Sequence, residues 1–304
     1  MHIHFKKIRS MGKNALYVRF DTVSPPLDLL SLARAICAED SGVGTPLLVC
    51  LFPSEKANVA LRAFLCDTEV PVPDVAVRAA GKLLYDAHEL SDFNATVEAD
   101  GKVHRIRVEP RDRYHTNVTM AMGAVVPVTE TTDVNAPTPM FYIECETNGY
   151  RYDYTPMMLG EEYAVSFVED VDDPLLTAAI PYFKGTSDGR HRIFCAHRSR
   201  DSFFVRIIRT DTGEDNTCGC GIAAAMAIGV ILGIADFNTR ITVKLPDEDV
   251  ICVVRKDLSV ILNASVKILF EGDFEYDNEY DDAFEPTAPT TNSHPIFRRE
   301  FDFE

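Results

Sequence analysis

The chain has 304 residues, 46% of them hydrophobic, which is enough to bury a core and to form two domains of ordinary size. Its formal net charge of −17 argues against a nucleic-acid partner, because phosphate binding needs a concentrated Lys/Arg surface. No apolar run approaches the ~20 residues that span a bilayer, and the eight cysteines show no framework spacing. We therefore expect a cytoplasmic protein with free thiols and no membrane partner.

The first half of the chain combines predicted strands with two predicted helices. Residues 2–8 alternate their side chains as a strand does, whereas Leu29, Leu32 and Ile36 recur at helical spacing. The strands expected from such patterns are 2–8, 15–20, 46–52, 57–64, 95–99 and 103–109, and the helices are 28–39 and 75–85.

The second half repeats this plan around one apolar helix. The expected strands are 140–146, 150–154, 163–168, 203–209, 240–245, 250–255 and 259–270, and the Ala/Ile/Val-rich helix is 221–232. Antiparallel strands with a central helix in each half predict an α+β class with a cleft between two domains, 1–120 and 121–274. Residues 275–304 are acidic and without periodicity, so we expect a disordered tail there.

The sharpest local feature is the segment 213–221, Gly-Glu-Asp-Asn-Thr-Cys-Gly-Cys-Gly, which leads into the last predicted helix. Cys218 lies where that helix begins, so free N–H groups and the helix dipole favour its thiolate and lower its pKa. The same N–H groups can hold a substrate carboxylate, and Gly219 and Gly221 let a ligand approach the backbone. Alternatively, Cys218 and Cys220 are small residues in a tight turn. A metal site is disfavoured, because no second Cys/His pair lies at ligand spacing.

This segment resembles the second active-site motif of the diaminopimelate epimerases, Gly-Glu-Thr-x-Ala-Cys-Gly-Thr-Gly. The matching residues are Gly213, Glu214, Cys218, Gly219 and Gly221. Other segments resemble the family in the same order along the chain, namely 7–12, 64–69, 78–86 and 165–172. The resemblance extends to about residue 275. It implies the diaminopimelate-epimerase-like fold, with two pseudo-symmetric domains and the active site in the cleft between them.

The resemblance also implies a mechanism. In that family a thiolate removes the α-proton of an amino acid and a thiol returns a proton from the opposite face, without pyridoxal phosphate. Cys218 is then an acid/base group of an amino acid epimerase or racemase, or of a related proton-shifting isomerase, acting on a small carboxylate-bearing substrate. The N-termini of two helices would stabilise the carbanionic transition state. We expect no cofactor and no metal.

The first cysteine of the family is absent from this chain. Counting forward from Asp67 places Asp74 at the missing thiol, and counting back from Arg78 places Pro73 there. Asp74 is the only nearby group that can carry a proton, so we expect it to act as the opposite base. Alternatively, Asp74 caps the helix that follows, since aspartate is among the best N-cap residues.

Other positions that resemble the family's substrate contacts have also changed. We expect substrate to meet Lys13 and Asn14 near the N-terminus, Glu161, His191, Arg209 and Thr210 in the second half, and Gly219, Cys220 and Gly221 at the helix start. Arg209 stands where the family has an acid and Glu161 where it has an amide, which disfavours diaminopimelate as substrate. Taken singly, each of these residues could be an ordinary solvated side chain.

Three other interpretations remain open. Glu214 and Asp215 resemble a motif of phenazine-biosynthesis isomerases, which use a carboxylate in place of paired thiols. A one-base isomerase would use Cys218, Asp215 or Asp74 on one substrate face. A lyase or cyclase of specialised metabolism would begin with the same proton abstraction, and a binding-only descendant would keep the fold without catalysis. A homodimer is compatible with the sequence.

Overall fold

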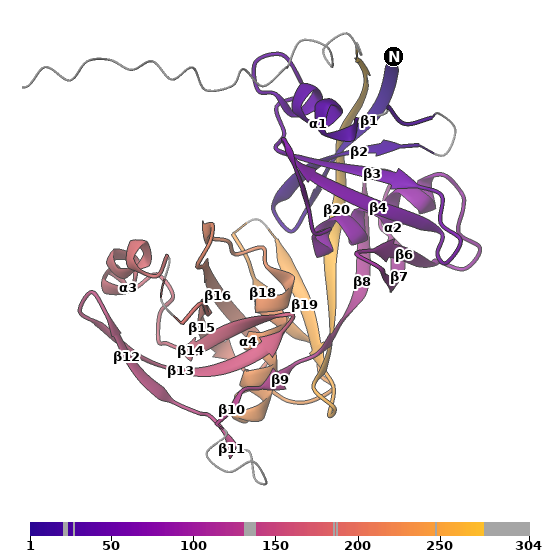
Figure 1. The fold of residues 1–304 in the computed structure, drawn as a ribbon. Helices are drawn as coiled ribbons and strands as arrows, with labels where there is room; N and C mark the ends of the chain where they lie inside the picture. Colours follow the sequence, from indigo (N-terminus) through magenta and orange to yellow (C-terminus); the bar gives the residue numbers. More distant parts are fainter. Residues whose placement is uncertain are drawn as a thin grey trace, which may run out of the picture.

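We describe the protein from a computed structural model. The described residues are 1–20, 24–26, 28–130, 138–184, 186, 188–246 and 248–276. They form two strand-rich lobes, each wrapped around one helix, as expected for an α+β protein (Figure 1). All but the first two residues of the predicted tail, 275–304, lie outside the described residues.

Helix α2 (Asp74–Asp86) fills the first lobe. Its buried alanines let strands approach closely. Gly81 allows a still closer approach, because a Cβ atom there would lie 2.6 Å from Ile106 Cδ1. Helix α1 (Leu29–Cys37) begins at Asp28, whose side chain accepts a hydrogen bond from the Leu30 amide at 2.8 Å. The strands of this lobe are β1 (His2–Ser10), β2 (Lys13–Arg19), β3 (Leu47–Phe52), β4 (Val59–Leu65), β5 (Thr68–Val70), β6 (Asn94–Ala99), β7 (Lys102–Pro110) and β8 (His115–Ala124).

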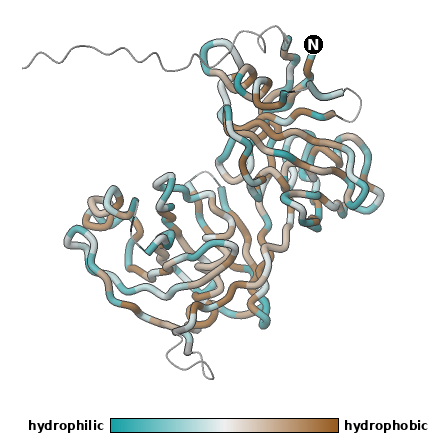
Figure 2. The backbone as a smooth tube through the Cα atoms, in the orientation of Figure 1, coloured by the Kyte–Doolittle hydropathy of each residue, from teal (hydrophilic) through white to brown (hydrophobic). Residues whose placement is uncertain are grey.

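Helix α4 (Gly219–Ile231) fills the second lobe. It is apolar on every side, which is typical of a helix enclosed by other elements, and Figure 2 shows hydrophilic residues gathered on the outer loops. The other elements of this half of the chain are β9 (Val126–Pro127), β10 (Thr129–Glu130), β11 (Thr138–Pro139), β12 (Ile143–Thr147), β13 (Tyr150–Leu159), β14 (Glu161–Phe167), α3 (Pro174–Ala179), the 3₁₀ helix η1 (Ile180–Tyr182), β15 (His191–Ser199), β16 (Ser202–Arg209), β17 (Gly213–Glu214), β18 (Ile241–Lys244), β19 (Asp249–Val254) and β20 (Ser259–Glu275). In the described part of the chain, no helix is long and apolar enough to cross a membrane.

Two long strands join the lobes. Strand β20 pairs with β19 and β8 and then continues along β1, where Phe274 lies opposite Ile3. The expected domain boundary at residue 121 falls inside β8, and the end of β20 belongs to the first lobe (Figure 1). The last predicted strand, 259–270, continues to Glu275 as β20, because backbone pairing with β1 and burial of Tyr276 hold these further residues.

Phe203 offers a test of the second lobe's packing. Its ring is fully buried on β16 and lies 3.8 Å from the position that a Cβ atom at Gly229 of α4 would take. We expect Phe203→Ala to lower the free energy of unfolding by about 3–5 kcal/mol, measured by denaturant titration. The neighbouring Phe204 is only half-buried on the other face of the strand and packs against Arg198, so Phe204→Ala should cost clearly less. Equal losses would contradict this packing.

Candidate active site

The two central helices have different residues at their N-cap positions. The N-cap of α4 is Cys218, whose Sγ atom accepts a hydrogen bond from the Gly221 amide at 3.4 Å. The N-cap of α2 is Pro73, which offers no capping side chain. Pro73 is therefore the structural counterpart of Cys218, and Asp74 is the first residue inside α2. The interpretation of Asp74 as the N-cap was wrong.

Asp74 nevertheless reaches the head of α4. A Cβ atom at Gly219 would lie 2.0 Å from Asp74 Oδ2 and 3.1 Å from the terminal carbon of Met122. Arg78, one turn along α2 and 0% exposed, donates from Nη1 to the same Asp74 oxygen at 2.8 Å. Asp74 itself remains 19% exposed. The structure thus brings the two predicted acid/base residues to one place from helices of opposite lobes.

The Cys218 sulfur is enclosed more tightly than the sequence indicated. Burial raises the pKa of its thiol above the usual range, and hydrogen bonds from Tyr163 and the Gly221 N–H group to the thiolate only partly oppose this effect. The predicted lowering of this pKa was wrong, because desolvation outweighs the field at the helix N-terminus. Burial also raises the pKa of Cys220, to about 12. At neutral pH Cys218 is therefore a neutral thiol, able to donate a proton.

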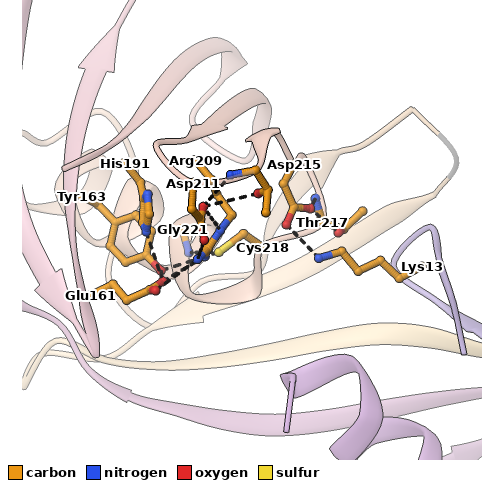
Figure 3. A network of polar contacts seen from close by, with 11 residues as sticks. Lys13, Glu161, Tyr163, His191, Arg209, Asp211, Asp215, Thr217, Cys218 and Gly221 are labelled. Carbon is orange, nitrogen blue, oxygen red and sulfur yellow. Dashed lines mark hydrogen bonds and ion pairs between the residues drawn. The ribbon is translucent and has the colours of Figure 1, made fainter. Parts of the chain in front are cut away.

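Four predicted substrate residues lie together at the ends of neighbouring strands, and Figure 3 labels three of them, Glu161, His191 and Arg209. Glu161 starts β14, and Arg209 ends β16; its Nη1 and Nη2 donate to the two Glu161 oxygens at 2.9 and 3.1 Å. His191 starts β15, and its Nε2 lies 3.3 Å from Glu161 Oε2. The amide of Thr210 donates to His191 Nδ1 at 3.1 Å. These four residues are held together by hydrogen bonds and ion pairs, so they form one connected polar network.

Arg209 has no spare charge for a ligand in this arrangement. Besides Glu161 it binds Asp211, at 3.0 Å, and this ion pair holds the pKa of the Asp211 carboxyl well below its usual range. Burial raises the pKa of Glu161, but the hydrogen bond and charge of Arg209 outweigh this effect, and the net pKa is lowered. Both carboxyl groups are ionised at neutral pH.

Lys13 connects the first lobe to the turn before α4. Its Nζ donates to Asp215 Oδ2 at 2.7 Å, and Thr217 donates to the other Asp215 oxygen at 2.6 Å. Burial alone would raise the pKa of Asp215, but these two donors lower it overall. The adjacent Asn14 is exposed, opposite Arg9 in the pairing of β1 with β2, and its role in substrate binding stays a prediction.

The glycines at the start of α4 serve protein packing. The space at Gly219 is taken by Asp74 and Met122, and a Cβ atom at Gly221 would lie 3.1 Å from Ile207 and 3.3 Å from Ile193. Ligand access to the backbone at these positions stays a prediction. The cleft beside Cys218 also stays a prediction. The described residues form hollows of 330, 430 and 640 Å³, and Cys218 lines none of these three.

Sequence reasoning missed three residues of the site. Tyr163 lies two residues after Glu161 on the same face of β14, and its hydroxyl lies 3.6 Å from Cys218 Sγ. Arg78 lies four residues after Asp74, a helical spacing that could have indicated the pair. No sequence pattern indicated Met122. Among the described residues, no three His, Cys, Asp or Glu side chains are grouped to hold a metal ion.

Comparison with curated proteins finds relatives along nearly the whole chain. A diaminopimelate epimerase of Bacillus cereus is 24% identical over 281 residues, covering 90% of this chain and 97% of its own. A diaminopimelate epimerase of Bacillus anthracis matches to the same extent. No family model matches the chain.

Solved structures show the same fold. A methylitaconate-delta-isomerase superimposes with a TM-score of 0.64 at 12% identity, covering 97% of this chain and 99% of its own. A hydroxyproline epimerase from Agrobacterium vitis, with trans-4-hydroxy-L-proline bound, gives 0.62 at 11% identity, with coverage of 92% and 94%. A phenazine biosynthesis protein of the PhzF family from Bacillus anthracis gives 0.60 at 13% identity, with coverage of 91% and 100%.

The fold is therefore that of the two-lobed, diaminopimelate-epimerase-like proteins, as the sequence predicted. Within this class the chain is similar to the diaminopimelate epimerases, with Pro73 and Asp74 where the resemblance places their first cysteine. The names of the relatives and neighbours are those of epimerases and isomerases, which supports an isomerase of this kind.

Proposed function

We propose that the chain is a cytoplasmic, cofactor-independent amino acid epimerase or racemase, or a related proton-shifting isomerase, with Asp74 and Cys218 as its proton carriers. One observation carries the proposal. The Asp74 carboxylate lies against Gly219 at the head of the helix that Cys218 caps. A carbon atom held between them would meet a carboxylate on one side and a thiol on the other.

The two groups suit opposite halves of a proton transfer. Asp74, paired with Arg78, is an acceptor for the α-proton of a substrate. Cys218 is a neutral thiol and delivers a proton to the other face. In this direction the reaction leaves Asp74 protonated and Cys218 as a thiolate, so both must exchange protons with water before the next turnover.

Backbone amides at the two helix N-termini stabilise the charge that develops in such a step. The first N–H groups of a helix have no carbonyl partner within that helix, so those of α2 and α4 could hold a carboxylate or a carbanionic transition state. A small carboxylate-bearing substrate fits this arrangement. Diaminopimelate fits it less well, because Arg209 and Glu161 already neutralise each other where the second amino acid group would lie.

Hydrogen exchange tests the proposed function. The purified protein would be incubated in deuterium oxide with a panel of amino acids and small carboxylates, and deuterium at the α-carbon would be followed by mass spectrometry. We expect incorporation for at least one member other than diaminopimelate. Absence of exchange across the panel, from a folded protein, would favour the binding-only interpretation.

A one-base isomerase is the second candidate. It is favoured by the replacement of the family's first cysteine and by the raised pKa of Cys218, which disfavours the thiolate as a base. In this case Asp74 alone would move a proton between two carbons of one substrate face. The product would differ from the substrate in the position of a double bond, which nuclear magnetic resonance distinguishes from inversion at one carbon.

Gly219 provides a test of the contact between the lobes. We expect Gly219→Ala to slow exchange about 100-fold, because the new methyl group displaces Asp74 by more than 1 Å. Gly229→Ala is the matched control on the same helix, since its methyl group would meet no atom closer than 3.5 Å. Unchanged exchange in Gly219→Ala would show that the position of Asp74 does not matter.

A further inference from the structure

The hydroxyl group of Tyr163 connects Cys218 to the polar network. The side chain is fully buried on β14, with its oxygen 3.2 Å from Glu161 Oε2 and 3.6 Å from Cys218 Sγ. An ionised carboxylate only accepts hydrogen bonds, so Tyr163 donates its single proton to Glu161. Toward Cys218 the phenol oxygen can then only accept. The thiol S–H must therefore be the donor, and the chain of bonds runs from sulfur to phenol to carboxylate.

The outer end of this chain is held in place and reaches solvent. Glu161 is 48% exposed and is fixed by two hydrogen bonds from Arg209. His191 Nδ1 accepts from the Thr210 amide, so the ring proton is on Nε2, which points at Glu161. Each group therefore has one orientation (Figure 3). Arg209 and His191, which were predicted to bind substrate, thus hold the Glu161 carboxylate at the outer end of the hydrogen-bond chain from Cys218.

We propose that Tyr163 is the proton relay of Cys218, linking the enclosed sulfur to the solvent-exposed carboxylate of Glu161. After Cys218 has given its proton to a substrate carbon, the phenol O–H proton moves to sulfur, a proton taken by Glu161 from water moves to the phenol oxygen, and the chain is restored. One proton enters at Glu161 and one arrives at sulfur, so the charges balance. The role rests on the proposed function only in that Cys218 exchanges protons during turnover.

The reach of the phenol proton to sulfur can be tested without a substrate, through alkylation of Cys218 by iodoacetamide. The thiolate is the reacting form, and a relay phenol must turn its O–H group to that thiolate, so Tyr163→Phe should disfavour the thiolate and slow alkylation at neutral pH by roughly threefold to tenfold, the effect of one hydrogen bond. An unchanged or faster rate would mean that the phenol does not donate to sulfur, which would overturn the proposal. Fragment masses distinguish Cys218 from Cys220. Tyr17→Phe, at a buried tyrosine of β2, is the matched control and should leave the rate unchanged.

A double-mutant cycle tests whether Glu161 acts through the phenol. We expect Glu161→Gln to change the pH profile of Cys218 alkylation in the native background and to have little effect when Tyr163→Phe is already present. Equal effects in both backgrounds would mean that Glu161 acts on Cys218 only through its charge and not through the Tyr163 phenol. That result would contradict the relay.

A spectroscopic measurement keeps the proposal testable if Tyr163→Phe does not fold. The infrared difference spectrum between the native protein and Cys218→Ala should contain an S–H stretching band displaced to lower frequency by hydrogen-bond donation. A band at the position of a free thiol would contradict the inferred direction. Neither measurement uses a substrate, so failure of the relay is distinguishable from failure of the proposed isomerase activity.

Discussion

Cys218→Ala is expected to lower the rate of deuterium incorporation into the substrate by roughly 10²–10⁴-fold, the usual contribution of a positioned acid/base group. The sulfur is the group that Tyr163 and the Gly221 amide hold at the head of α4, and the described residues offer no second thiol in the same position. Because burial raises the pKa of Cys218, its proton-donating form stays available at neutral pH and is lost only as the pH rises through that raised pKa.

The control for Cys218 is another thiol of the same lobe. Cys252 on β19 is fully buried in the apolar core of the second lobe, so Cys252→Ala should leave a small cavity and nearly native exchange in the folded protein. A Cys218→Ala variant that retains exchange with a native melting temperature would remove Cys218 from the mechanism. Cys218→Ser should also be inactive, because a hydroxyl is a much weaker acid than a thiol.

Asp74→Asn is expected to lower the same rate by a comparable factor, roughly 10²–10⁴-fold. The amide keeps the size of the side chain and can still accept a hydrogen bond from Arg78, so folding should be preserved. What is lost is the ability to take a proton. A two-base mechanism loses both directions of the reaction in this variant, since each turnover needs Asp74 once.

Asp86→Asn is the matched control for Asp74→Asn. Asp86 lies at the other end of α2 and pairs with the buried Lys82 one turn away, just as Asp74 pairs with Arg78. Both substitutions therefore remove a carboxylate from an i,i+4 ion pair on one helix, but only Asp74 faces α4. Equal losses of exchange in the two variants would point to a structural effect of the ion pairs and contradict a catalytic role of Asp74.

The central helices and most strands could be predicted because their signals are local. The predicted helix at 75–85 is α2, and the predicted helix at 221–232 is α4 with its start two residues late. Apolar residues at helical spacing and strict alternation in strands depend on a few neighbouring positions, so tertiary contacts are not needed to recognise them. The same is true of Cys218 at a helix start, which the apolar run from residue 221 indicated.

Several features could not be predicted, because they depend on partners distant in the chain. Strand β8 carries polar residues on its outer face and is held by pairing with β7 and β20. The ion pair of Glu161 and Arg209 joins residues 48 positions apart, so two residues expected to meet substrate turned out to neutralise each other. The direction of the pKa shift of Cys218 follows from burial, which only the packed structure reveals.

Asp74 shows both the reach and the limit of sequence reasoning. Its chemistry identified it as a proton carrier near the missing thiol, but two ways of counting disagreed by one residue. In the structure Pro73 takes the N-cap position that Cys218 takes in α4, and Asp74 reaches the site from one residue farther on. Only the contact with Gly219 could show that the carboxylate still faces α4.

The isotope content of substrate and product early in the reaction tests the account most directly. In deuterium oxide, two carriers on opposite faces should place deuterium at the reacting carbon of the product, while the recovered substrate keeps its protium. That result would support Asp74 and Cys218 acting from helices of opposite lobes. Deuterium entering the recovered substrate as fast as the product would contradict it, because a single group would then be both removing and returning the proton.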